Sequence, residues 1–276
     1  MKSAILVVGG ERSLSKTIEH LKKNLLEPNR PVLFFACETD NPERLLRYFD
    51  GFEIGGSLLL TSFRTDEYNR VQEICLSRPA YSQEVFQRAM NTDRMCWSKD
   101  YVRNSGTIIQ YYQLWKAWCL LLDYERQNHM KFDFCVKWRL DALLTNPLVF
   151  ANIPEYGTED EMRSMGNEYM KQHLRKLSTE DGWYEHGIGH SVEDNIVWSF
   201  GPEQVFMSKR KNFQHLGTMV FFQGLWDVGN NYAFNSETFF HEFCNRNQLI
   251  HWCFLEEGSP VFAYTTNTPY MLTILR

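Results

Sequence analysis

The feature that most constrains the fold is the alternation of strand-like and helix-like segments at the start of the chain. Residues 4–8 form a short apolar run typical of a buried strand, and after a Gly-Gly turn apolar residues recur at helical spacing at Leu14, Ile18, Leu21 and Leu25. A second apolar run at 31–37 precedes Asn41 and Pro42, which are typical of a helix cap and a first helical turn. This β-α-β-α order predicts a parallel sheet, because parallel neighbours need a crossover helix.

The length and composition of the chain predict one continuous unit. It has 276 residues, 43% of them hydrophobic, and no internal repeat or low-complexity linker divides it. We therefore predict a single α/β domain over residues 1–276, built on a mostly parallel central sheet flanked by helices. Further elements are predicted as helices at about 65–90, 106–129 and 158–177, a strand at 196–200, a helix beginning at Gly201-Pro202, and apolar segments around 250–255 and 260–264.

Charge and cysteine usage exclude several classes of protein. The net charge is -5 without a long run of Lys and Arg, which argues against nonspecific nucleic-acid binding. The seven cysteines are scattered without a C-x-x-C pair, which predicts neither a disulfide framework nor a zinc site. The N-terminal apolar run is too short for a signal peptide, and no transmembrane-length stretch follows. Together these features predict a protein of the reducing cytoplasm.

A short strand in the middle of the chain ends in two opposite charges. Within residues 132–144 the side chains alternate as in a strand, and Arg139 and Asp141 continue one of its two faces. In an open α/β sheet, ligands bind at the carboxyl ends of the strands, so this pair suits a charged substrate. The alternative is an Arg–Asp ion pair that only fixes the end of the strand.

The turn after the first strand reads Gly9-Gly10-Glu11-Arg12-Ser13 and has the spacing of neither G-x-G-x-x-G nor the P-loop. Its backbone N–H groups and the following helix N-terminus still favour an anion, and Arg12 could add a bidentate contact to phosphate. The alternative is an ordinary βα turn that carries a surface arginine.

A segment rich in glycine, histidine and acids, residues 186–195, holds further candidates. Its His-x-x-x-His-x-x-x-Asp spacing resembles a metal-ligand pattern, but two glycines inside it argue against the continuous helix that this alignment needs. Glu193 and Asp194 could bind hydroxyls or act as a general base, and the alternative is a solvated acidic turn. Glu237 starts a predicted helix at about 236–247, where the helix dipole alone explains an acidic residue.

Several short motifs, taken in chain order, resemble one known family. They are the opening βα turn with Arg12, the helix around Tyr112-x-x-Trp115-Lys116, the strand end Lys137-Trp138-Arg139-Leu140-Asp141, the block Glu193-Asp194-Asn195-x-x-x-x-Phe200-Gly201-Pro202 and the late Ser236-Glu237-x-x-Phe240. This pattern resembles the small nucleotide-sugar-dependent glycosyltransferases of the GT-A fold, particularly those encoded by large DNA viruses of algae (chlorella-virus type). The resemblance covers nearly the whole chain through short, degenerate motifs.

The resemblance implies a GT-A-like fold whose first half, residues 1–146, binds a nucleotide-sugar donor such as a UDP- or GDP-sugar. The donor-binding residues it implies are Gly9, Gly10, Arg12, Lys116, Arg139 and Asp141. The Asp-x-Asp motif that binds Mn²⁺ or Mg²⁺ in this family stands here as Arg139-Leu140-Asp141, so Asp141 is the implied metal ligand. An arginine there would repel a cation unless the diphosphate were already bound, so metal dependence stays open.

The second half, residues 147–276, is implied to bind a glycan or glycoprotein acceptor and to carry the catalytic base. Asp194 is the first choice for that base and Glu237 the second, with His190, Trp198 and Trp226 implied on the acceptor side. In a virus of this type the enzyme would act in the host cytoplasm on glycans of the capsid protein. Inverting and retaining transfer are both compatible with these residues.

Two other classes of protein also fit the sequence. One is a noncatalytic carbohydrate-binding protein, in which the same aromatic and acidic residues recognise a glycan. The other is a different nucleotide-dependent transferase, such as a nucleotidyltransferase, which would need further metal-binding acids near Asp141. That segment contains no convincing second acid.

Overall fold

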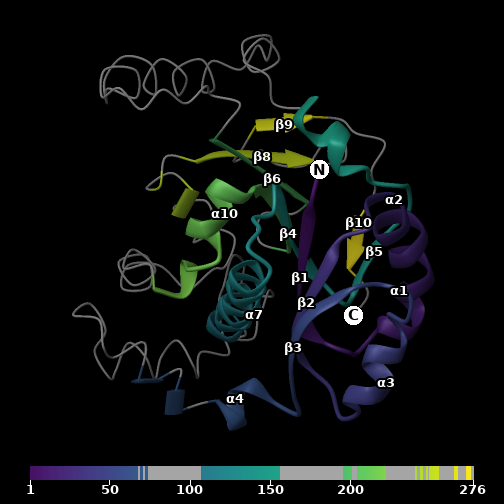
Figure 1. The fold of residues 1–276 in the computed structure, drawn as a ribbon, viewed down its shortest axis with the longest axis vertical. Coiled ribbons are helices and arrows are strands. Elements are labelled where there is room, and N and C mark those ends of the chain that lie inside the picture. Colours follow the sequence, from purple (N-terminus) through teal and green to yellow (C-terminus); the bar gives the residue numbers. More distant parts are fainter. Residues whose placement is uncertain are drawn as a thin grey trace, which may run out of the picture.

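A mostly parallel β-sheet with helices on both faces forms the centre of the computed structural model (Figure 1). The structure describes residues 1–67, 69–70, 72–73, 107–155, 195–200, 204–221, 240, 243–244, 247, 249–254, 264–266 and 272–274. Its strands are β1 Ser3–Gly10, β2 Val32–Glu38, β3 Ile54–Leu60, β4 Phe134–Arg139, β5 Ala142–Leu144, β6 Ile196–Phe200, β7 Val205–Lys209, β8 Ile250–Phe254, β9 Tyr264–Thr266 and β10 Leu272–Ile274. Within the described residues, eight of them form one sheet in the order β3-β2-β1-β4-β7-β6-β8-β9, and β5 pairs separately with β10.

The order of the strands reverses between β1 and β4, near the middle of the large sheet. In the described part of the chain, neighbouring strands are parallel except where β7 pairs with β4 and β6. The chain adds β1, β2 and β3 in one direction, whereas β4 lies on the other side of β1. This arrangement confirms the predicted α/β class with a mostly parallel sheet. It also places a reversal between β1 and β4, where open α/β sheets leave a ligand-binding crevice at the carboxyl ends of the strands.

Helices cover both faces of this sheet (Figure 1). The long α7 (Thr107–Gln127) and α10 (Arg210–Leu216) lie on one face, and α1 (Leu14–Leu21), α2 (Glu27–Asn29) and α3 (Pro42–Arg47) lie on the other. The remaining helical segments are short, namely a wide turn at Lys22–Leu26, α4 at Phe63–Asp66, η2 at Phe150–Glu155 and η4 at Met219–Phe221. Among the helices that can be described, none is long and apolar enough to cross a membrane.

The first two strands and the helices that follow each of them form where the sequence predicted them. The predicted strands at 4–8 and 31–37 correspond to β1 and β2, and the apolar face of the first helix is buried as expected. Asn41 caps α3, since its side chain accepts a hydrogen bond from the N–H of Arg44 at 2.9 Å, and Pro42 occupies the first turn.

The central strand β4 is buried on both faces, which fits the apolar residues at four of its six positions. Phe134, Val136 and Trp138 pack into the core beneath α1, whereas Cys135 packs on the opposite side with α7. Each of these side chains is at most 1% exposed. The strand predicted within residues 132–144 is therefore confirmed as part of the core.

The prediction of a helix that begins at Gly201-Pro202 is wrong. A strand, β7, follows instead, and the next helix begins only at Arg210. Val205, Phe206 and Met207 are all buried, and the strand pairs antiparallel with β4 and β6, so burial between two strands outweighs the helix-start signal of a proline. The predicted helix at 158–177, and most of those at 65–90 and 236–247, lie outside the described residues.

Polar side chains of the first helical segment fasten the chain that follows β4. The hydroxyl of Thr17 donates to the carbonyl of Leu140 at 2.8 Å, and the amide of Asn24 donates to the carbonyl of Leu144 at 2.7 Å. Thr17 and Asn24 are both buried, so these bonds also satisfy their own polar groups. The backbone on either side of Asp141 is thereby held against α1.

Gly217, at the end of α10, allows that helix to approach α7 closely. A Cβ atom at this position would stand 2.5 Å from Cγ of Trp118, which is too close for the buried indole ring to stay in place. We expect Gly217→Ala to lower the free energy of unfolding by about 1–3 kcal/mol, the usual cost of overpacking, as measured by urea denaturation. Gly10→Ala is the control, because its Cβ would meet nothing closer than 3.8 Å. Equal stability of both variants would contradict the close approach of α10 to Trp118.

Candidate functional site

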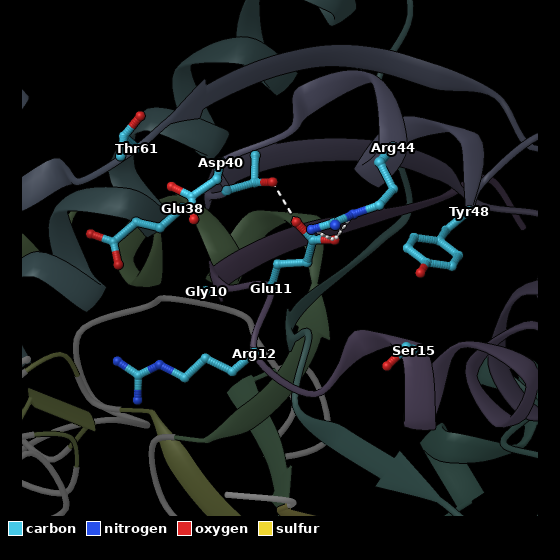
Figure 2. A pocket seen from close by; sticks show the side chains of 10 residues that line it. Gly10, Glu11, Arg12, Ser15, Glu38, Asp40, Arg44, Tyr48 and Thr61 are labelled. Carbon is cyan, nitrogen blue, oxygen red and sulfur yellow. Dashed lines mark hydrogen bonds and ion pairs between the residues drawn. The ribbon is translucent and has the colours of Figure 1, made fainter.

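An open cavity of about 620 Å³ lies at the carboxyl ends of the first strands (Figure 2). Its walls come from the turn after β1, the end of β2, α3 and the residue that follows β3. Most of the side chains that line it are charged or carry hydroxyl groups, including Glu11, Arg12, Glu38, Asp40 and Arg44. The cavity therefore suits a polar ligand.

The turn after β1 brings Arg12 and Glu38 close to the same glycine. Gly9 has φ of +100°, a conformation that side chains rarely adopt, and the N–H of Glu11 donates to the carbonyl of Glu38 at 3.0 Å. A Cβ atom on Gly10 would stand 3.8 Å from Cγ and Nε of Arg12 and 4.0 Å from Oε2 of Glu38. The absence of a side chain at Gly10 thus leaves room between Arg12 and the carboxylate of Glu38.

Glu11 is fully engaged in holding α3 against the β1 turn. One carboxylate oxygen accepts a hydrogen bond from Nε of Arg44 at 3.0 Å and lies 3.0 Å from Nη2 in an ion pair, and the other accepts a hydrogen bond from the hydroxyl of Thr39. The hydrogen bond to Glu11 raises the pKa of Arg44 above its usual value. These contacts shape the wall of the cavity and use both oxygens of Glu11.

Other polar groups of the cavity remain available. Among the described residues, the side chains of Arg12, Ser15, Asp40, Tyr48 and Thr61 make no hydrogen bond or ion pair. Glu38 uses one oxygen to accept the N–H of Phe63 at 2.9 Å, which leaves its second oxygen open. Figure 2 shows Arg12 apart from the Glu11–Arg44 pair. The cavity thus offers one unpaired cation and several hydrogen-bond acceptors.

Arg139 and Asp141 form a bidentate ion pair at the end of β4. Nε of Arg139 donates to Oδ1 of Asp141 at 2.8 Å, and Nη2 donates to Oδ2 at 2.7 Å. Their side chains remain 27% and 12% exposed, respectively. Because Arg139 pairs in register with Val8, two residues before Gly10, the ion pair lies across the strand-order reversal from the β1 turn. The ion-pair alternative is therefore observed, at a position that a ligand could still reach.

The described residues do not fit a resident divalent cation. Asp141, the implied metal ligand, already gives both oxygens to Arg139. In the part of the chain that the structure describes, no group of three or more His, Cys, Asp and Glu side chains could hold a metal ion. We therefore derive no chemical step through a metal.

Lys116, predicted to bind the donor, does not line the cavity. Its Nζ lies 3.4 Å from Oε2 of Glu67 and above the rings of Tyr112 and Trp115. The hydroxyl of Tyr112 donates to the same Glu67 carboxylate, and burial together with this hydrogen bond raises the pKa of Tyr112. Lys116 is thus part of a cluster between α4 and α7.

Trp198, predicted on the acceptor side, is a core residue. It is 1% exposed and its ring packs on Phe134 with centroids 6.0 Å apart, so neither face is open to a sugar. His190, Asp194, Trp226 and Glu237 lie outside the described residues.

The structure also brings in residues that sequence reasoning missed. Glu38 and Asp40 follow the predicted second strand directly, at the edge of the sheet that already held Gly10 and Arg12. Their position after a buried strand was the available signal. Glu11 and Arg44 had no such signal, since their pairing depends on how α3 packs.

Comparisons with known proteins add no family to this description. No family model matches the chain, and no curated protein matches it. The fold and the site define it as an α/β protein with a polar cavity at the carboxyl edge of its sheet.

Proposed function

We propose that this protein is a glycosyltransferase that moves a sugar from a nucleoside-diphosphate sugar to a hydroxyl of a glycan acceptor. The observation that carries the proposal is the placement of the polar cavity and the Arg139–Asp141 pair on either side of the strand-order reversal. In open α/β sheets this place binds nucleotides. The resemblance noted in the sequence supplies the reaction class.

The two arginines of the site suit the diphosphate of such a donor. Arg12 has no ion-pair partner among the described residues, and Arg139, at the end of the strand next to β1, is partly exposed. Guanidinium groups bind phosphate oxygens in bidentate geometry and stabilise the negative charge that a leaving diphosphate develops. Arginine can therefore supply much of the charge that a metal ion supplies elsewhere.

The cavity suits the nucleoside of the donor. Its volume of about 620 Å³ falls within the usual range for small-molecule sites. Its carboxylates accept hydrogen bonds from ribose hydroxyls, as an acid near the end of the second strand does in dinucleotide-binding folds. The nucleoside would lie between the β1 turn and α3, with its phosphates toward β4.

The reaction would join an acceptor oxygen to the anomeric carbon while the bond from that carbon to the diphosphate breaks. The bonding electrons leave with the diphosphate, and in an inverting reaction a carboxylate takes the acceptor proton. Asp194 is the first candidate for that carboxylate and Glu237 is the second.

Exchange of each carboxylate for its uncharged isostere tests this role. We expect Asp194→Asn to abolish transfer without weakening nucleotide binding, because the base acts on the acceptor proton and not on the donor. Glu237→Gln is measured in parallel, and loss of transfer in that variant alone would assign the base to Glu237.

Thermal unfolding with added nucleotides tests the proposal directly. A ligand that binds only the folded state raises its stability, so UDP, GDP, CDP or ADP should raise the Tm without Mn²⁺. We expect Arg12→Ala to weaken that nucleotide by about tenfold through loss of a phosphate contact. Lys16→Ala is the matched control, since Lys16 is exposed on α1 and does not line the cavity. If no nucleotide stabilises the protein, the proposal fails and noncatalytic glycan binding takes its place.

A further inference from the structure

We infer that the donor is a guanosine-diphosphate sugar and that Asp40 selects its base. This inference rests on the proposed function and names the nucleotide that the same cavity takes. It follows from which polar groups of the cavity are unpaired, and from their order along the sheet edge.

The unpaired groups at the end of β2 are acceptors. Glu11 has both oxygens engaged by Arg44 and Thr39, and Glu38 has one engaged by the N–H of Phe63. Asp40 makes no hydrogen bond or ion pair among the described residues and is exposed at the rim. This side of the cavity can therefore receive hydrogen bonds from a ligand, and its two open carboxylates repel phosphate.

The order of the charges fixes the direction of the nucleotide. We place the phosphates next to Arg12 and, across the strand-order reversal, next to Arg139, because the acids at the end of β2 repel phosphate. Glu38 comes next, because its Oε2 lies only 4.0 Å from the position of a Cβ on Gly10, and it would accept from the ribose hydroxyls. Asp40, two residues further along, then faces the base.

A carboxylate in that place distinguishes the bases by their hydrogen-bonding edges. Guanine presents two adjacent donors, N1–H and the N2 amino group, which a carboxylate accepts together. Uracil presents a single N–H between two carbonyl oxygens, which a carboxylate repels, and adenine and cytosine each present one amino group beside a ring acceptor. Asp40 therefore favours guanine.

Calorimetric titration of the full chain with GDP, IDP, UDP, CDP and ADP measures this preference. We expect GDP to bind on the order of 10- to 100-fold more tightly than UDP, CDP and ADP, the worth of charge-assisted hydrogen bonds. IDP, which lacks only the N2 amino group, should bind about tenfold more weakly than GDP.

A variant that exchanges an acceptor for a donor tests Asp40 itself. Asp40→Asn puts an amide N–H₂ where xanthine carries its C2 carbonyl, so we expect this variant to lose GDP affinity and gain affinity for XDP. Asp50→Asn is the matched control, because Asp50 is exposed after α3 and outside the cavity. Glu38→Gln should weaken all five nucleotides alike, since it faces the ribose that they share.

The outcomes separate this inference from the function on which it rests. If UDP, CDP or ADP binds as tightly as GDP, the base assignment is overturned and nucleotide-dependent transfer stands. An unchanged GDP-to-XDP preference in Asp40→Asn also overturns it. If none of the nucleotides binds, the proposed function fails.

Discussion

Replacing Arg210 by methionine should lower the free energy of unfolding by about 3–5 kcal/mol, because it leaves a buried carboxylate without its main partner. Glu125 of α7 has a side chain only 1% exposed, and it accepts hydrogen bonds from Nε and Nη2 of Arg210 at 2.9 and 2.8 Å. The guanidinium of Arg210 also stacks on Trp118, 4.3 Å from the ring centroid. Urea denaturation near neutral pH measures the loss.

The loss of unfolding free energy in Arg210→Met should become smaller as the pH falls. Burial opposes ionisation of Glu125, but hydrogen bonds from Arg210, the Phe132 N–H and Lys131 outweigh it and lower the pKa of Glu125. In the native protein the resulting stability is present above the unfolded pKa of glutamate and is lost as pH falls toward the folded value. In Arg210→Met the unpaired carboxyl can bind a proton instead. The gap between variant and native protein should therefore narrow from about pH 7 to about pH 4.

Two further variants test whether the buried charge is the cause. Lys131 is 72% exposed, so Lys131→Met should cost less than about 1 kcal/mol. The double variant Arg210→Met with Glu125→Gln removes the orphaned charge and keeps an acceptor for the Phe132 N–H, so it should recover part of the stability. A double variant that loses the sum of both single effects would rule out this explanation.

Replacing Arg139 by alanine should weaken nucleoside-diphosphate binding by about 100-fold, because it removes a positive charge beside the place of the phosphates. The variant also leaves the carboxylate of Asp141 unpaired beside the place of the phosphates, and that carboxylate repels them. Arg139→Lys should recover only part of the affinity, because an ammonium group lacks the planar fork of a guanidinium. Titration calorimetry with the nucleotide that stabilises the protein measures these affinities.

Asp141→Asn distinguishes an arginine-based site from a metal-based one. If Arg139 binds the diphosphate, loss of the Asp141 carboxylate leaves the positive charge of Arg139 uncompensated, and metal-free affinity should stay equal or rise. If Asp141 instead holds a cation, affinity should fall in this variant, and Mn²⁺ should strengthen binding only in the native protein. The first result is the one the ion pair leads us to expect.

The sequence predicted the elements whose signal is local, and missed those that depend on partners. The β1 and β2 runs and the Asn41–Pro42 helix start are set by apolar runs and caps. β3 escaped prediction because its sequence, IGGSLLL, contains two glycines and none of its residues is fully buried. It forms because β2 supplies a parallel partner, and Gly55 and Gly56 allow Phe34 and Leu120 to approach.

The residues of the candidate site likewise divide into those with a local sequence signal and those whose position depends on their neighbours in space. Gly10, Arg12, Arg139 and Asp141 were predicted as site residues because strand ends are visible in sequence, and they lie at or just after the carboxyl ends of the neighbouring strands β1 and β4. Lys116 was misplaced because a helix position does not reveal its neighbours, and here Glu67 of the α4 region takes its charge. Trp198 was misplaced because an aromatic residue in a strand has the same sequence signature in the core and in a binding site.

The central position of β1 has a consequence for how the chain folds as it leaves the ribosome. One of the two neighbours of β1, the strand β4, begins about 130 residues after it, and Thr17 and Asn24 precede their partners Leu140 and Leu144 by 123 and 120 residues. Contacts between such distant segments slow folding, and an unpaired strand edge invites association in the meantime. A nascent chain arrested before β4 should therefore be protease-sensitive and need chaperone protection. Arg139 of the proposed donor site is added only when residues 134–139 emerge.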